Sequence, residues 1–232
     1  MIDYIKKTIT LNKSIHQNKL SLLNFGNGSV IDRKKNIVFI KASGILPNQV
    51  NLKNIVGVKL LKKNAYKIVY NKKLIPSVDL NFHIRIYNYL KNINSIIHVH
   101  SFFGTILSQL KIEPKCIGTT HADFYNKPIP LSGEFKLNNE NQYDDKIFLS
   151  IKKRLKKEKN LPPGILLRSH GVLSWGKNIN KTIENSVAIE FISKLYYHSL
   201  LIKKNINIDK NLINFHYYRK NGKNKRYGQD RK

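Results

Sequence analysis

The spacing of apolar residues changes along the chain and predicts where helices and strands alternate. The first apolar positions lie among polar residues at helical spacing, which predicts an amphipathic helix; they are Ile2, Ile5, Ile9 and Leu11. Turn-forming residues at 24–29 then end this period. The runs SVID and NIVFIKAS, separated by residues 33–36, predict a pair of strands, and a second pair is expected between Val56 and Val69.

The rest of the chain alternates between the two periods. Pro76, Ser77 and Asp79 are typical of a helix start and precede the apolar-rich run LNFHIRIYNYL. SIIHVHS predicts a strand, FFGTILSQL a helix, residues 118–130 a turn-rich segment, and DDKIFLSIKKRLKKEKN a helix with a solvated lysine face. ILLRSHGVLSW predicts a strand and turn, residues 180–204 the longest helix, and a basic, aromatic tail begins near Asn211. Strands interleaved with helices predict an α/β fold whose mixed sheet is covered on both faces.

Composition narrows the function classes. The 232 residues, 41% of them hydrophobic, suit a single domain, and no apolar run is long enough for a membrane span or a signal peptide. The formal charge is +28, yet the basic residues are scattered and only seven are arginine, so a specific nucleic-acid surface is not indicated. A net positive field would still attract an anionic substrate. The single cysteine excludes an intramolecular disulfide and agrees with a cytoplasmic location.

Histidines provide the first candidate chemistry. His98 and His100 lie two residues apart on a predicted strand and therefore share one face, about 6.6 Å apart along the chain. Two such imidazoles can bind one ion, although an HVH triplet is more often an ordinary polar pair. His170, next to a glycine turn, is a candidate third ligand or a satisfied structural histidine. Asp79 is a candidate carboxylate or a helix N-cap. Three imidazoles would suit zinc (Zn2+) better than magnesium or calcium.

Seven motifs occur in an order that resembles the class II aldolase and L-ribulose-5-phosphate 4-epimerase family. They are FGNGSVID, FIKASG, IPSVD, IHVHS, GTTHADFYNKPIP, RSHGVLSWGK and HYYRKNGKNKRYGQ. The resemblance spans nearly the whole chain and implies one domain over residues 1–232. It also implies a three-layer α/β/α sandwich with a central mixed, largely antiparallel sheet. Family members assemble as four-fold symmetric tetramers with active sites between subunits, so a homotetramer is expected.

The resemblance also assigns roles to single residues. It implies that His98, His100 and His170 bind zinc, with Asp79 as a metal-proximal carboxylate. Similar aldolases generally carry Glu at the position of Asp79 and the epimerases Asp, so the IPSVD motif favours an epimerase. The two acid/base groups of the epimerases fall on Asp123 and Tyr227, which without the resemblance would be a turn residue and a tail aromatic.

The resemblance also implies which residues bind the substrate. Those that match the family's phosphate cradle and its surroundings are Gly26, Asn27, Lys41, Ser43, Gly44, Ser77, Val78 and Asp79. Without the resemblance, these residues would be hairpin and capping residues. His216 and Arg219 match residues of a C-terminal tail, about 211–232, that reaches the site of a neighbouring subunit. Three departures are present. Val78 stands where the epimerases usually carry Ser, and Arg168 where His is common. The NNENQYDDK segment does not align with an acidic stretch of the family, so no site residue is assigned there.

The expected function is therefore zinc-dependent interconversion of L-ribulose 5-phosphate and D-xylulose 5-phosphate through cleavage and re-formation of the C3–C4 bond. The alternatives are a class II sugar-phosphate aldolase and a non-catalytic polyanion-binding relative.

Overall fold

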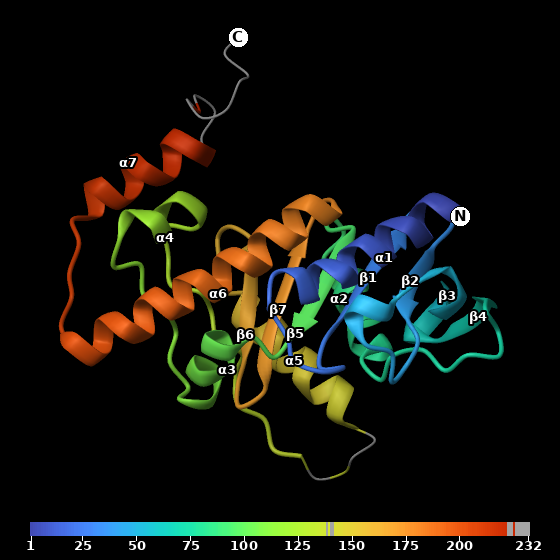
Figure 1. Cartoon of the computed structure of the whole chain (residues 1–232). Helices are drawn as coiled ribbons and strands as arrows, with labels where there is room; N and C mark the ends of the chain where they lie inside the picture. The colour runs from blue at the N-terminus through green and yellow to red at the C-terminus, as the bar shows by residue number, and fades with distance from the viewer. Residues whose placement is uncertain (138, 140–141, 222–224, 226–232) are drawn as a thin grey trace.

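A single antiparallel sheet forms the centre of the molecule. The computed structural model describes residues 1–137, 139, 142–221 and 225. Its seven strands follow the order β4-β3-β2-β1-β5-β7-β6 within these residues (Figure 1). They are β1 (Asn27–Asp32), β2 (Ile37–Lys41), β3 (Ile55–Leu60), β4 (Tyr66–Tyr70), β5 (Ser95–Val99), β6 (Gly164–Leu167) and β7 (Gly171–Gly176). All neighbouring strands are antiparallel, and one isolated bridge, Leu131 to Leu166, is parallel.

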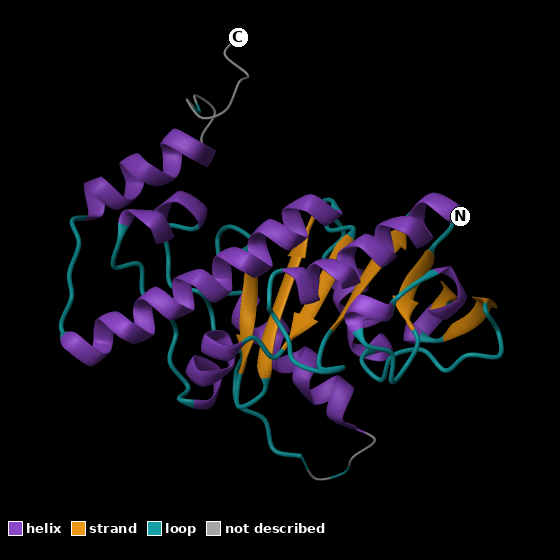
Figure 2. Ribbon diagram, in the orientation of Figure 1, coloured by secondary structure: helices purple, strands orange, loops and turns teal. Residues whose placement is uncertain are grey.

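Helices cover both faces of this sheet (Figure 2). α1 (Ile2–Gln17), α3 (Phe102–Gln109) and α6 (Ile179–Ile202) pack on one face, and α2 (Leu80–Tyr89) and α5 (Tyr143–Leu155) on the other. The short 3-10 turns η1 (Pro47–Gln49), η2 (Leu52–Asn54) and η3 (Lys62–Asn64) lie in connections between β2, β3 and β4. The predicted three-layer α/β/α sandwich is confirmed, and its strand pairing is more uniformly antiparallel than expected.

Alternation along β5 decides which face each side chain joins. Ile97 and Val99 belong to the core beneath α1, α3 and α6, whereas Ile96 belongs to the core beneath α2 and α5. His98 has the same parity as Ile96 and therefore points toward α2. Its ring meets the edge of Phe82 on that helix, with ring centroids 6.4 Å apart. The pleat thus aims His98 at one defined face.

Two helices differ from the sequence prediction. The segment expected to be turn-rich contains α4 (Thr119–Phe124), with Gly118 at its N-cap. The tail expected from Asn211 begins with α7 (Lys210–Asn221), in which no residue is buried. α7 has no buried apolar stripe to reveal a helical period, and it packs instead against α4. Among the described residues, no helix combines the length and apolar character needed to cross a bilayer.

Candidate metal centre

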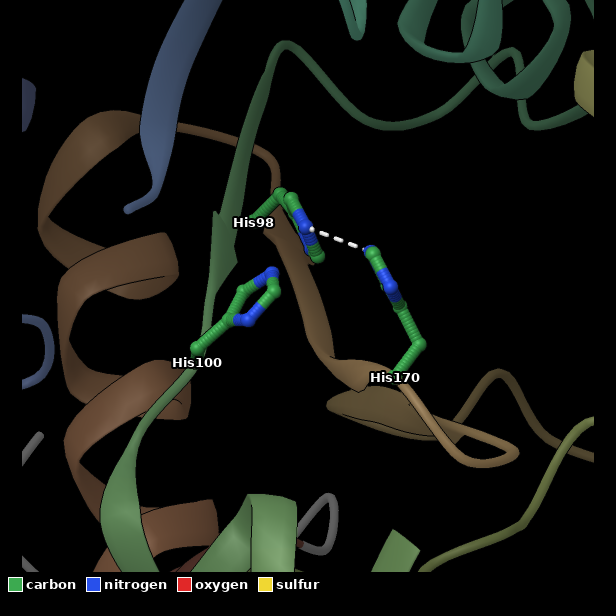
Figure 3. Close-up of side chains that lie close together, drawn as sticks. All are labelled: His98, His100 and His170. Atoms are coloured by element: carbon green, nitrogen blue, oxygen red, sulfur yellow. Dashed lines mark hydrogen bonds between the residues drawn. The ribbon is translucent and has the colours of Figure 1, made fainter. Parts of the chain in front are cut away.

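Three histidine rings converge at one end of the sheet (Figure 3). His98 lies near the end of β5, His100 just beyond it, and His170 in the turn between β6 and β7. Because His98 pairs with Leu173 in the antiparallel ladder, the β6–β7 turn is held beside the end of β5. One ligand nitrogen from each of the three rings lies within 4.8 Å of the others. The structure therefore brings together the three imidazoles that the sequence suggested as ligands.

The ring nitrogens have the spacing that a small divalent ion needs. The Nε2 atoms of His98 and His170 are 3.1 Å apart, the contact dashed in Figure 3. Tetrahedral zinc with Zn–N bonds of about 2.0–2.1 Å holds its nitrogens roughly 3.3 Å apart. The Nδ1 atom of His98 lies 3.1 Å from the carbonyl oxygen of Val172, and an N–H donated there leaves the Nε2 lone pair for an ion. The donor set and its spacing could hold a metal ion.

Electrostatics keep two of these rings neutral. Burial, reinforced by His98 and His100, lowers the pKa of His170 to about 4. Burial and His98 also lower the pKa of His100. Imidazole binds a metal only in its neutral form. Near pH 7 these two rings are ready to bind an ion without first losing a proton.

Asp79 lies next to the triad at the start of α2. It occupies the N-cap position, yet its carboxylate forms no capping hydrogen bond and instead accepts one from the Nδ2 of Asn27. Burial alone would raise the pKa of Asp79. Electrostatic interactions with nearby histidines, led by His98, together with the Asn27 hydrogen bond, instead lower this pKa below its ordinary value. Asp79 is thus an ionised carboxylate close to the triad, and its role toward a metal remains a prediction.

Loops that the resemblance assigned to phosphate binding meet beside Asp79. The backbone N–H of Ser77 donates to the carbonyl of Lys41 at 3.0 Å, and the N–H of Ser43 donates to that of Ile75 at 2.9 Å. Gly44 is exposed and has a φ of +75°, a conformation that favours glycine. The predicted positions 41–44 and 77–79 are therefore adjacent in space.

Gly26 and Asn27 connect this loop cluster to the triad. Asn27 pairs with His98 across β1 and β5. Gly26 has a φ of +107°, and a Cβ there would lie 2.8 Å from the carbonyl oxygen of His98. Only glycine permits this close approach of the two backbones.

Lys41 and Val78 differ in their accessibility within the cluster. Lys41 is 3% exposed, and its Nζ donates to the carbonyl of Ile45 at 2.8 Å. Burial lowers the pKa of Lys41. Val78 is 79% exposed, so the departure from the usual Ser places an apolar group at the surface of the cluster.

Asp123 lies in a separate cluster with the C-terminal helix. Its carboxylate is 3.1 Å from the Nδ1 of His216, 3.8 Å from an Nη of Arg219 and 2.8 Å from the Nζ of Lys220. Figure 1 shows α4 and α7 side by side, outside the sheet. Burial raises the pKa of Asp123, but hydrogen bonds from Lys220 and His216 lower it below its ordinary value. Tyr227, the other expected acid/base residue, lies outside the described residues.

Three aromatic side chains near the triad were missed by sequence reasoning. The ring of Phe25 stacks on His100 with centroids 5.7 Å apart, and Tyr143 meets the edge of His170 at 6.4 Å. His83 is fully buried on α2 and its Nδ1 lies 2.8 Å from the hydroxyl of Ser29. For Phe25, its position just before the Gly26 turn was the available signal; Tyr143 carried none, because the loop before α5 separates it from every recognised motif.

Comparisons with known proteins agree with this architecture. A family model described as the class II aldolase and adducin N-terminal domain matches residues 6–197. The fold is similar to that of an L-fuculose 1-phosphate aldolase, with a TM-score of 0.76 and 19% identity over 94% of this chain and 95% of that chain. An aldolase II superfamily protein from Pseudomonas syringae has a TM-score of 0.77 and 15% identity, over 94% and 84% of the two chains. A sugar-phosphate aldolase from Thermotoga maritima has a TM-score of 0.68 and 16% identity, over 88% and 98%.

Proposed function

Because the chain belongs to the class II aldolase and adducin N-terminal domain family, we propose that it is a metal-dependent enzyme that makes and breaks a carbon–carbon bond in a sugar phosphate. The observation that carries this proposal is the convergence of His98, His100 and His170 within 4.8 Å. Neutral nitrogen ligands at this spacing are typical of catalytic zinc, which keeps a further position for substrate.

The specific reaction proposed is the 4-epimerisation of L-ribulose 5-phosphate to D-xylulose 5-phosphate. Asp79 supports this choice over aldol cleavage, because the resembling aldolases carry the longer Glu at this position. A shorter carboxylate held by Asn27 is less able to protonate the cleaved fragment and release it. The fragment is then retained for re-addition.

A bound zinc ion would supply Lewis acidity that stabilises negative charge on the C2 and C3 oxygens of the substrate. Either Asp123 or Tyr227 accepts the proton of the C4 hydroxyl as the C3–C4 bond breaks, which leaves an aldehyde at C4 and the electron pair on the C3 fragment. The aldehyde then turns over, the bond re-forms on its opposite face, and the other residue protonates the C4 oxygen. The substrate and the product contain the same atoms, so the reaction consumes no co-reactant.

The protonation states of these two residues suit opposite roles. Lys220 and His216 hold the pKa of Asp123 low, so its carboxylate is ionised and can accept a proton. A tyrosine has an ordinary pKa of about 10 and begins as a proton donor. The loops at Lys41, Ser43 and Gly44 would bind the phosphate through backbone N–H groups, a hydroxyl and an ammonium, and so keep the aldehyde in the site.

The separation of Asp123 from the triad supports a site shared between subunits. Asp123 makes its ion pairs with α7, whereas the triad lies on β5 and the β6–β7 turn. Since α7 packs on α4, Asp123 and α7 form one unit. We propose that this unit completes the metal centre of a neighbouring copy in a homotetramer.

An aldolase is the second candidate, favoured by the names of several structural neighbours, three of which are called L-fuculose 1-phosphate aldolases. An epimerase should convert ribulose phosphate to xylulose phosphate with only traces of free aldehyde. An aldolase should release the aldehyde in proportion to the substrate consumed.

The test combines metal analysis with this assay on one preparation. Chelator-treated protein should lose turnover and regain it with zinc. Asp123→Asn and Tyr227→Phe should each lower kcat at least about 100-fold with zinc content unchanged. Asp209→Asn is a matched carboxylate control just before α7, where Asn keeps the capping hydrogen bond from the N–H of Leu212, and it should keep full activity. Full turnover in metal-free protein would contradict the proposal, as would salt-sensitive RNA binding without any turnover.

Subunit mixing tests the shared site. Chains with His170→Ala and chains with Asp123→Asn should each be inactive alone. In mixed oligomers about one quarter of the sites would combine an intact triad with an intact Asp123 from a neighbour. Recovery near this level supports the shared site, and mixed oligomers without activity would contradict it.

A further inference from the structure

A concave site lies at the opposite end of β5 from the metal centre. This cavity of about 290 Å³ is lined by Tyr4, Lys7, Val30, Ile31, Arg33, Lys34, Asn94, Lys177, Asn178 and Ile179. Asn94 directly precedes β5, whereas His98 and His100 lie at the end of that strand. The two sites are therefore separated by the length of β5, and no residue belongs to both.

The charge of the cavity wall has one sign. Lys7, Arg33, Lys34 and Lys177 line it, and none of the lining residues is acidic. Lys7 pairs with Asp3 at 2.7 Å. Within the described residues, Arg33, Lys34 and Lys177 form no ion pair. Three positive charges thus surround one cavity without an ion-pair partner among the described residues.

Arg33 is the fixed member of this group. Its Nη atoms donate to the carbonyl oxygens of Tyr87, Leu90 and Ile93 at 2.9, 2.9 and 2.6 Å, which holds the guanidinium in place. Its Nε is buried and has no acceptor among the described residues. Burial lowers the pKa of Arg33, as expected for a cation removed from water without a carboxylate partner.

The start of α6 adds to the positive potential. This helix of 24 residues begins at Ile179, directly after Lys177 and Asn178 on the cavity wall. The side chain of Asn178 accepts from the N–H of Lys181. The first N–H groups of a helix carry the positive end of its dipole and favour an anion.

The floor of the cavity is apolar. Val30 is 3% exposed, and Tyr4 and Ile179 are half-buried beside it in the core beneath α1, α3 and α6. An inorganic ion would leave this apolar surface in contact with water, whereas an ester with a compact apolar group would cover it. Three unpaired cations favour a phosphate monoester, which carries about −1.5 to −2 at pH 7, over a single carboxylate.

We propose that this cavity binds a small organic phosphate, with the phosphate against Lys34, Lys177 and the start of α6 and an apolar group on Tyr4, Val30 and Ile179. This site is independent of the metal centre and of the reaction proposed for it.

Calorimetric titration with phenyl phosphate tests the proposal. The double variant Lys34→Gln/Lys177→Gln removes two exposed cations from the cavity wall. The matched control Lys72→Gln/Lys73→Gln removes two exposed lysines from the turn after β4 and changes the net charge equally. Binding should be at least about tenfold weaker in the cavity variant than in the wild type and unchanged in the control. Equal weakening in both variants would show a general charge effect and overturn the proposal.

Two further titrations test which part of the ligand is recognised and at which site it binds. Inorganic phosphate should bind at least about tenfold more weakly than phenyl phosphate, because it leaves the apolar floor uncovered; equal affinity would overturn the organic ligand. Lys41→Gln alters the loop cluster at the metal centre. If this variant loses phenyl phosphate binding and the cavity variant keeps it, the ligand binds at the metal centre and the proposed site is wrong.

Discussion

Replacement of His170 by alanine should abolish the stabilisation that zinc gives to the folded chain. The ring of His170 lies 4.9 Å from that of His98 and 4.7 Å from that of His100, measured between centroids. It is the only ring of the three that comes from outside β5 and its continuation. Without it, two imidazoles remain, one fewer than the protein ligands that hold zinc in catalytic sites.

The expected size of this stabilisation follows from the coupling of zinc binding to folding. Zinc at about 100 times its dissociation constant stabilises a chain that binds it only when folded by about 2.7 kcal/mol. At about 2–4 °C per kcal/mol for a chain of this size, the unfolding midpoint should rise by about 5–11 °C. Because burial lowers the pKa of His170 to about 4, protons do not compete with zinc at pH 7.

Thermal unfolding measured across a zinc titration at pH 7 and fixed protein concentration tests this reasoning. The wild type and His16→Ala, which replaces an exposed histidine at the end of α1, should show the full rise. His170→Ala should show a shift near zero and should unfold within about 1 kcal/mol of the wild type without metal. An equal zinc-dependent rise in His170→Ala would refute the three-histidine site.

Three other predictions concern the scaffold and its titration. Gly26→Ala places a Cβ 2.8 Å from the carbonyl of His98 at a φ of +107°, so it should cost about 1–3 kcal/mol and weaken zinc binding, measured by denaturation and zinc titration. Asn12→Ala leaves the buried backbone N–H and carbonyl of Gly28 without their partners and should lower the free energy of unfolding by about 3 kcal/mol in urea. Burial lowers the pKa of His121 to about 4 from 6.5, so the unfolded chain binds the proton first. The contribution of His121 to the free energy of unfolding should therefore fall by about 3 kcal/mol between about pH 6.5 and pH 4, measured as the difference between the pH profiles of the wild type and His121→Gln, and parallel profiles would contradict this.

The elements that sequence predicted best are those with one buried face. β5 alternates between two cores, and α2 buries apolar residues against the sheet, so both periods were visible in the sequence. α7 buries none of its described residues, and α4 is a short helix between turn formers. Their structure depends on contact with each other, and no local period records such a contact.

In the candidate site, too, local patterns were predictable from the sequence and long-range contacts were not. Alternation alone placed His98 and His100 on one face. His170 joins them only through the pairing of His98 with Leu173, a long-range register that one sequence does not specify. The resemblance to a family supplied that connection. The contacts of Asp123 with His216 and Lys220 are likewise tertiary, and no spacing in the sequence indicated them.

The most direct measurement is the location of zinc in crystals of the zinc-loaded protein by anomalous scattering at the zinc absorption edge. The account predicts one strong peak per chain, about 2.0–2.1 Å from the Nε2 atoms of His98 and His170 and from a ring nitrogen of His100. A peak bound elsewhere, or crystals of active protein with no peak among these three rings, would contradict it.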